Sequence, residues 1–185
     1  ITASVGAAIN LEKTLADINV ILNETNVGLR KFSTELFTIA KGTGQSFNAV
    51  SEAALEFARQ GLAVEETLKR TRDAMILVRL SGLDVKSSVE SITATLNSFN
   101  QTVITSTELV NKLANVDAAF AVSSADLAEA IRRVGSSAQD SNVNIDQLIA
   151  LVTTAQQVTA RGGSVIGNSL KTIFTRLQRP KVIAD

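Results

Sequence analysis

The two side chains that most often carry out chemistry in proteins are missing from this sequence. Its 185 residues contain neither His nor Cys. His is the commonest general base and metal ligand, and Cys supplies thiolate ligands and disulfides. A nucleophile would therefore need a Lys or a carboxylate as its partner. We expect no enzyme activity, no cofactor and no metal centre in this chain.

One loop is nevertheless rich in oxygen ligands. Asp140, Asn142, Asn144 and Asp146 place carboxylates and amides close together in the sequence, and Ca²⁺ prefers such ligands. The loop lacks the Asp-x-Asp-x-Asp-Gly order and the terminal bidentate Glu of a calcium loop. The competing interpretation is a turn followed by the N-cap of a helix, and we favour it.

Two other segments also have a chemical and a structural interpretation. Residues 159–164 form a Gly-rich loop leading into a helix, and such a loop can present N–H groups to a phosphate. This loop lacks the Lys and the spacing of a P-loop and follows a helix, which favours a simple helix break. Glu65 and Glu66 resemble paired catalytic carboxylates, but both fall in a first helical turn, where the helix dipole favours acids.

The elements that carry these segments are predicted to be helices. Apolar residues recur at spacings of three and four, which indicates one face of an α-helix. We find no alternation of apolar and polar residues of the kind that predicts a strand, and most of the expected loops are short. The sequence predicts an all-α fold of about eight or nine short amphipathic helices joined by Gly and Ser turns, in a bundle or array of helical hairpins. The apolar stripes cover residues 11–22, 29–39, 50–57, 65–80, 85–99, 106–120, 123–138, 144–155 and 166–177.

Five residues are expected to mark helix ends rather than to bind anything. Gly61 is placed to adopt the left-handed conformation after one helix, and Gly82 ends the next. Gly162 and Gly163 break the chain before the last helix, and Pro180 closes that helix. These five are the structural positions that we single out.

Helix starts are also marked by residue type. Asp84 and Ser123 precede apolar stripes as N-caps, with Asp126 three residues after Ser123. Asn144 is followed three residues later by Gln147, which is the arrangement of a capping box. We find no linker, so residues 1–185 are expected to form one all-α region.

Composition excludes several classes of function. Apolar residues make up 45% of the chain, which disfavours disorder. The formal net charge is zero, which disfavours general electrostatic binding to nucleic acid or to a membrane surface. The stretch 161–185 is locally basic, which we interpret as a solvated helix face.

No apolar run approaches the ~18 residues that span a bilayer. The chain begins at Ile1 without a signal-peptide pattern, so we expect an internal fragment of a longer protein.

Six short motifs follow one another along the chain. They are INLEKTL at 9–15, FNAVSEAA at 47–54, EFARQGL at 56–62, SSADLAEA at 123–130, GGS at 162–164 and GNSLKTIFTRLQRP at 167–180. In this order they resemble the core region of phage tail tape-measure proteins. Each motif alone is weak, so the resemblance, which covers residues 9–180, depends on their order and on the closing helix. One departure is the turn at 161–165, where the family often has a small-residue Gly-x-x-Gly pattern.

The resemblance implies a structural role rather than catalysis. Tape-measure proteins act as rulers in the lumen of a growing tail tube and leave through it when DNA is delivered. The expected partners are copies of the same chain, tail tube proteins and tail-tip or baseplate hub proteins. The expected location is the tail lumen or tip of the virion, and the host cytoplasm during assembly. The alternative function is a general helical scaffold or adaptor.

One stripe predicts association directly. The helix expected over 65–80 carries apolar residues on more than one side, including Ala74 to Val78. A surplus apolar surface is usually an interface, so this helix is a candidate contact with a second copy or a tail protein. The alternative is that the surplus is buried within the chain.

The stripes make a direct prediction about stability. Replacing Leu96 or Leu170 by Asp should destabilise the fold by several kcal/mol, because each change would bury an unpaired charge on a core stripe. Thermal or denaturant unfolding of the two variants measures the effect. An unchanged melting temperature would mean that the stripe concerned faces solvent.

Overall fold

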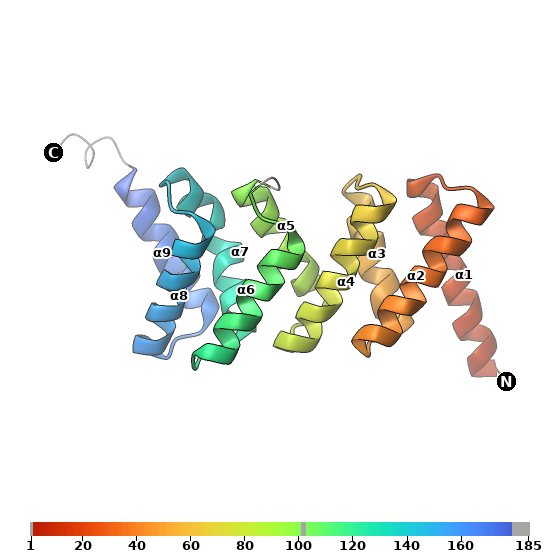
Figure 1. Ribbon diagram of the computed structural model, residues 1–185, viewed down its shortest axis with the longest axis horizontal. Helices are drawn as coiled ribbons and strands as arrows, with labels where there is room; N and C mark the ends of the chain where they lie inside the picture. The colour runs from red at the N-terminus through yellow and green to blue at the C-terminus, as the bar shows by residue number, and fades with distance from the viewer. Residues whose placement is uncertain (1, 101–102, 179–185) are drawn as a thin grey trace. The chain divides into compact units, whose positions relative to one another are not determined.

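The computed structural model describes residues 2–100 and 103–178, with side chains from Leu11 onward (Figure 1). Within these residues it contains nine α-helices and no strand, which confirms the predicted all-α fold. Pro180, predicted to close the last helix, lies outside the described residues. The helices are α1 (Thr2–Leu22), α2 (Asn26–Thr43), α3 (Phe47–Arg59), α4 (Val64–Ser81), α5 (Val85–Phe99), α6 (Ser106–Ala119), α7 (Ser124–Asp140), α8 (Ile145–Thr159) and α9 (Gly163–Leu177).

The chain divides into two compact units. The first unit contains Ile1–Arg79 and Asp84–Val89, and the second contains Leu80–Leu83 and Glu90–Asp185. Each unit buries its own set of apolar side chains, so each is described by itself.

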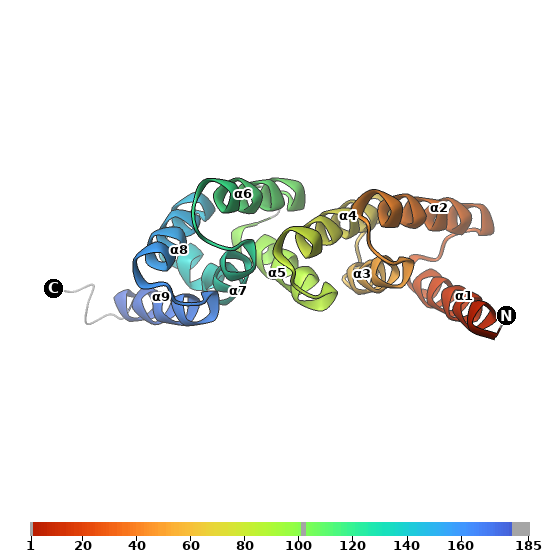
Figure 2. The same ribbon diagram turned by 90° about the horizontal axis from the view of Figure 1, so that it is seen from below.

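In the first unit, α3 packs against both α1 and α2 (Figure 2). Val50 and Phe57 of α3 and Leu36 of α2 have no exposed surface. The helix begins where Ser46 Oγ accepts the N–H of Ala49 at 3.1 Å, an N-cap that orients its apolar face. Local capping and the apolar stripe of α3 therefore act together to build this core.

The surplus apolar surface expected on α4 is largely buried. Ala74, Met75 and Leu77 have no exposed surface, and Ile76 is the large apolar side chain left 40% exposed. Arg70 on the same helix is only 2% exposed, and its Nε donates to Glu66 Oε1 at 2.7 Å. Such a buried cation requires partners of this kind. The structure thus favours the alternative interpretation, in which this surplus is covered within the chain.

In the second unit, α7 is the helix around which the others are arranged. It packs against α6, α8 and α9, and Leu127, Ile131 and Val134 on it have no exposed surface (Figure 2). Gly135 lies against Ser98 and Phe99 of α5, where a Cβ would come within 2.9 Å of Ser98 Oγ. A side chain at position 135 would therefore require the Ser98 and Phe99 side chains to shift.

Three buried threonine hydroxyls form hydrogen bonds within their own helix. Thr71, Thr95 and Thr153 each donate to the backbone carbonyl four residues earlier, at 2.7–2.8 Å. This local bond lets a β-branched polar residue enter a core without a partner from another helix. It explains how these three threonines pack among apolar side chains.

The helix starts match the sequence prediction at three positions. Ser123 Oγ accepts the N–H of Asp126, and Asn144 and Gln147 form a capping box. Asp84 accepts the N–H of Ser87 at 2.7 Å and the Ser87 hydroxyl at 3.0 Å. These hydrogen bonds hold the pKa of the exposed Asp84 carboxyl below its ordinary value.

Leu96 and Leu170 do not have equivalent environments, contrary to the expectation that both lie in the core. Leu96 is 1% exposed, whereas Leu170 is half-buried and lines a groove. A charge at position 170 can reach solvent from there, so the expected cost of Leu170→Asp falls well below that of Leu96→Asp.

The Asp84 cap predicts a pH effect. A lowered native pKa means that the stabilisation is fully present above the unfolded pKa and is lost as the pH falls through the native value. Asp84→Asn keeps an N-cap but removes the charge, and should cost about 0.3–1 kcal/mol near pH 7 from the lost interaction with the helix dipole. The difference should vanish as the pH falls well below about 4. Urea unfolding of both proteins across this range measures it, and a difference independent of pH would contradict the assignment.

Candidate functional site at the junction of α7, α8 and α9

The oxygen-rich loop is used for structure in the folded chain. Asn144 Oδ1 accepts the N–H of Gln147 at 2.9 Å, and Gln147 Oε1 accepts the N–H of Asn144 at 3.0 Å. Asp146 Oδ1 accepts from Lys112 Nζ at 2.6 Å, which joins α8 to α6. In the part of the chain that the structure describes, no cluster of three or more His, Cys, Asp or Glu could hold a metal ion.

The Glu129 carboxylate is paired with two arginines. Burial alone would raise the pKa of Glu129, but hydrogen bonds from Arg132 and Arg133 outweigh it and hold that pKa below its ordinary value. Arg132 also reaches Glu90 of α5 at 3.2 Å. A general acid working near neutral pH needs a raised pKa, so this cluster fits a structural brace. Glu65 and Glu66 lie in the first turn of α4, as predicted from the dipole.

The Gly-rich loop is occupied by an anion from the chain itself. The N–H of Gly163, at the start of α9, donates to Asp126 Oδ1 at 2.6 Å. Asp126 Oδ2 accepts from Gln156 Nε2 of α8 at 2.7 Å and from the Ser123 hydroxyl at 3.0 Å. One carboxylate on α7 thus contacts the beginning of α9 and the end of α8. A helix N-terminus attracts anions, and here Asp126 fills that role.

Close packing explains why Gly stands at the start of α9. A Cβ at Gly163 would overlap the backbone carbonyl of Asp126, and one at Gly167 would lie 2.9 Å from the carbonyl oxygen of Ala130. Gly163 and Gly167 are both buried, and they bring α9 directly onto the backbone of α7. The sequence predicted that Gly163 breaks the helix, but no local pattern predicted its contact with the backbone of α7.

The other predicted structural residues lie at helix ends. Gly61 has φ of 75° and Gly82 has φ of 73°, both in the left-handed region that Gly adopts readily. Gly162 has extended backbone and is the N-cap of α9. The left-handed residue between α8 and α9 is Ala160, with φ of 52°. The left-handed conformation costs an L-residue about 1–2 kcal/mol. Because Ala rarely adopts it, the sequence did not predict a left-handed turn at this position.

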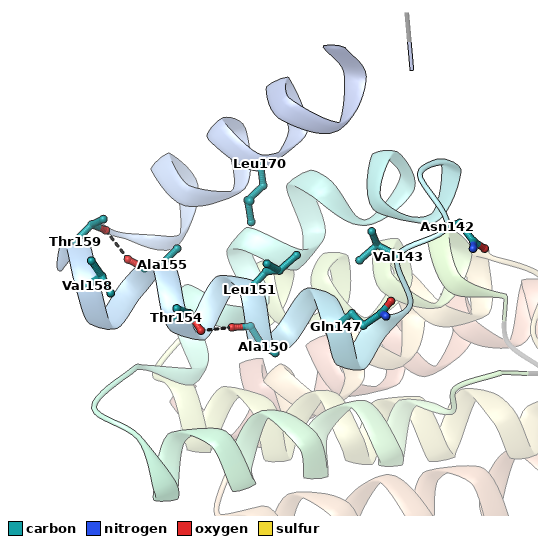
Figure 3. A pocket seen from close by; sticks show the side chains of 10 residues that line it. All are labelled: Asn142, Val143, Gln147, Ala150, Leu151, Thr154, Ala155, Val158, Thr159 and Leu170. Atoms are coloured by element: carbon teal, nitrogen blue, oxygen red, sulfur yellow. Dashed lines mark hydrogen bonds between the residues drawn. The ribbon is translucent and has the colours of Figure 1, made fainter. Parts of the chain in front are cut away.

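A groove lies between α8 and α9. It encloses about 830 Å³, and none of the residues lining it is charged. Figure 3 shows the two helices diverging from the turn that joins them, with Leu151 of α8 and Leu170 of α9 directed toward the space between them. Val143, from the loop before α8, lies at the open end. The tight contact of α9 with α7 leaves this space on the α8 side unfilled.

The two threonine hydroxyls of the groove are bonded to their own helix. Thr154 donates to the carbonyl of Ala150 at 2.9 Å, and Thr159 donates to the carbonyl of Ala155 at 2.6 Å (Figure 3). The hydroxyls therefore turn toward their own helix and leave methyl groups at the surface. Leu151 and Val158 are the large apolar side chains of the groove that are exposed.

Within the described residues, every helix lacks either the length or the apolar character that crossing a bilayer requires. The basic residues Arg161, Lys171 and Arg176 are exposed at the ends and outer side of α9, as expected for a solvated face, whereas Arg179 and Lys181 lie outside the described residues.

Comparison with known proteins gives one family. A family model described as phage-related minor tail protein matches residues 31–185. No solved structure matches the chain.

The contact of Gly163 with α7 predicts a specific sensitivity. Gly163→Ala should destabilise the chain by about 2–3 kcal/mol, because the added methyl group meets backbone that cannot move aside. Gly42→Ala is the matched control. Gly42 lies inside α2 with nothing within 4 Å of the added Cβ, so the change should be neutral or stabilise by up to ~1 kcal/mol. Denaturant unfolding of both variants measures this, and equal effects would contradict the assigned contact.

Proposed function

The chain belongs to the phage-related minor tail protein family, and on that premise we propose that it is the folded core of a tape-measure protein. In this proposal the chain is not an enzyme. It helps to set the length of the tail tube during assembly and is released when DNA is delivered. It lies in the tail lumen or at the tail tip of the virion, and in the host cytoplasm while tails assemble. Its partners are copies of itself, tube proteins and tail-tip or hub proteins.

The observation that carries the proposal is the repeated reversal of the chain. The longest helix has 21 residues, which is about 32 Å. Left-handed residues stand at the end of one helix after another, at Asn23, Gly44, Gly61, Gly82, Asn100, Asn142 and Ala160. A straight helix of 185 residues would instead measure about 280 Å. This part is therefore better suited to assembly and docking than to serving as the measuring rod.

The chemistry of the described residues supports a structural role. The acids examined above are engaged in caps and ion pairs, and the Gly-rich loop is filled by Asp126. The exposed face of α8 and α9 is apolar and uncharged along the groove. An apolar surface of this kind fits protein contacts better than nucleic acid, which requires basic residues.

Tail assembly tests the proposal. In a phage that encodes this chain, in-frame deletion of residues 1–185 should remove most complete tails, counted and measured by negative-stain electron microscopy. The Gly163→Ala variant should reduce complete tails in the same direction, since it weakens the fold, and Gly42→Ala should leave them unchanged.

Two outcomes would overturn parts of the proposal. Tails of normal number and normal length after the deletion would rule out the tape-measure role. Tails of normal number shortened by roughly 280 Å would mean that the chain works as an extended ruler, and would rule out the docking role.

A further inference from the structure

The groove between α8 and α9 changes in character from one end to the other. Its narrow end lies at the turn, residues 160–162, that joins the two helices, and Thr159 lies beside that turn. Its open end carries the exposed amides of Asn142 and Gln147 (Figure 3). Between the ends the lining is apolar, apart from the Thr154 hydroxyl that is bonded to its own helix. A ligand that matches this order has a polar group at one end and an apolar chain behind it.

The narrow end limits how thick an occupant can be. The two helices separate gradually from the short turn that joins them (Figure 3). A helix with its side chains is about 10–12 Å across, so it could cover the open end but could not reach Thr159 between α8 and α9. An unbranched alkyl chain is much thinner and can follow the groove along its whole length.

The length of the groove sets the length of that chain. From Gln147 to Thr159 the helix α8 advances by about 18 Å, at ~1.5 Å per residue. An extended alkyl chain with C–C bonds of about 1.5 Å advances by about 1.25 Å per carbon. A chain of about 14 carbons would therefore reach from the amides to the turn.

The chemistry of the open end favours a head group without charge. None of the residues lining the groove is charged, so a charged head would lose hydration without gaining a counter-ion. Gln147 uses its Oε1 to accept the N–H of Asn144, which leaves its NH₂ group to donate to a ligand. The amide of Asn142 can both donate and accept. Hydroxyl groups are the neutral head that both amides can bind.

We propose that the α8–α9 groove binds a neutral single-chain amphiphile, such as a monoacylglycerol. Its alkyl chain lies between Leu151 and Leu170, which point into the groove from the two helices (Figure 3), and its hydroxyl groups lie at the open end. The inference goes beyond the proposed function and does not depend on it. Ile173 and Leu177 are exposed outside the groove lining and remain available to the protein contacts proposed above.

Isothermal titration calorimetry on the 185-residue chain tests the proposal with octanoyl-, decanoyl- and dodecanoylglycerol, each below the concentration at which it forms micelles. The affinity should rise about two- to threefold for each added CH₂. Complete burial would give about fourfold, and one side of the groove is open. Dodecanoate and dodecyltrimethylammonium carry charged heads on chains of the same length, and they should bind about tenfold more weakly or worse.

One variant and its matched control test the position of the alkyl chain. Leu151→Asp should weaken the binding of dodecanoylglycerol by about tenfold or more, because it places a charge in the apolar wall. Ile173→Asp changes a side chain of α9 that is 51% exposed and lies outside the groove lining, so it should leave the affinity unchanged. Leu151 is itself 43% exposed, so circular dichroism and the melting temperature of both variants should match the wild type.

A second variant tests the position of the head group. Asn142 has φ of 58°, a conformation that Gly adopts readily, so Asn142→Gly removes the amide and keeps the turn. It should weaken all three monoacylglycerols by about two- to tenfold, the contribution of one hydrogen bond. The gain in affinity per CH₂ should stay the same, because the alkyl chain is not affected.

Contrary results would reject the inference in distinct ways. Absence of saturable binding, or equal losses for Leu151→Asp and Ile173→Asp, would mean that the groove is no site for an amphiphile. Stronger binding of a charged amphiphile would reject the neutral head. An uncharged helical peptide that binds the groove when dodecanoylglycerol does not would assign the surface to a protein partner instead.

The tail experiment is independent of these measurements. A chain that binds no amphiphile but is still needed for complete tails would reject this inference alone. A chain that binds dodecanoylglycerol but whose deletion leaves tails normal would reject the proposed function alone.

Discussion

The second unit depends on the contact between the Asp126 carboxylate of α7 and the first turn of α9. Asp126 accepts the N–H of Gly163 with one oxygen and the Gln156 side chain with the other. The carboxylate supplies negative charge where the dipole of α9 is positive, and it fastens the end of α8 to the same point. Because Gly163 and Gly167 have no side chains, α9 approaches the backbone of α7 closely enough for this bond to form.

The groove is a consequence of that contact. A helix held tightly against α7 at its first turns cannot also follow α8 along its length, so α8 and α9 diverge from their turn. Leu170 is left lining the open space instead of filling a core. The same arrangement leaves Leu151 and Val158 of α8 exposed along the groove. A bond that stabilises the unit internally therefore also creates the apolar face available to a partner.

The polar residues of the chain serve its architecture. Thr71 and Thr95 bond to carbonyls of their own helices, Ser123 caps a helix start, and Glu129 pairs with two arginines. Surface ion pairs contribute about 0–1 kcal/mol each, so stability comes mainly from the buried apolar stripes. Such a distribution is consistent with a structural role in the phage tail.

The sequence alone determined the helices and most of their ends. Helical period, N-caps at Ser123 and Asn144 and the left-handed Gly61 and Gly82 all depend on residues within four positions of one another, and local spacing shows these directly. The order of motifs also pointed to a phage tail family.

Only the tertiary structure decided which stripes became core and which became surface. Leu96 and Leu170 have similar patterns, yet one is buried and the other lines a groove. The contact between Asp126 and Gly163 joins residues 37 positions apart, and Ala160, not Gly, takes the left-handed turn before α9. These features depend on how closely and at what angle whole helices pack. That geometry is the sum of many contacts between distant residues, and no local spacing encodes it.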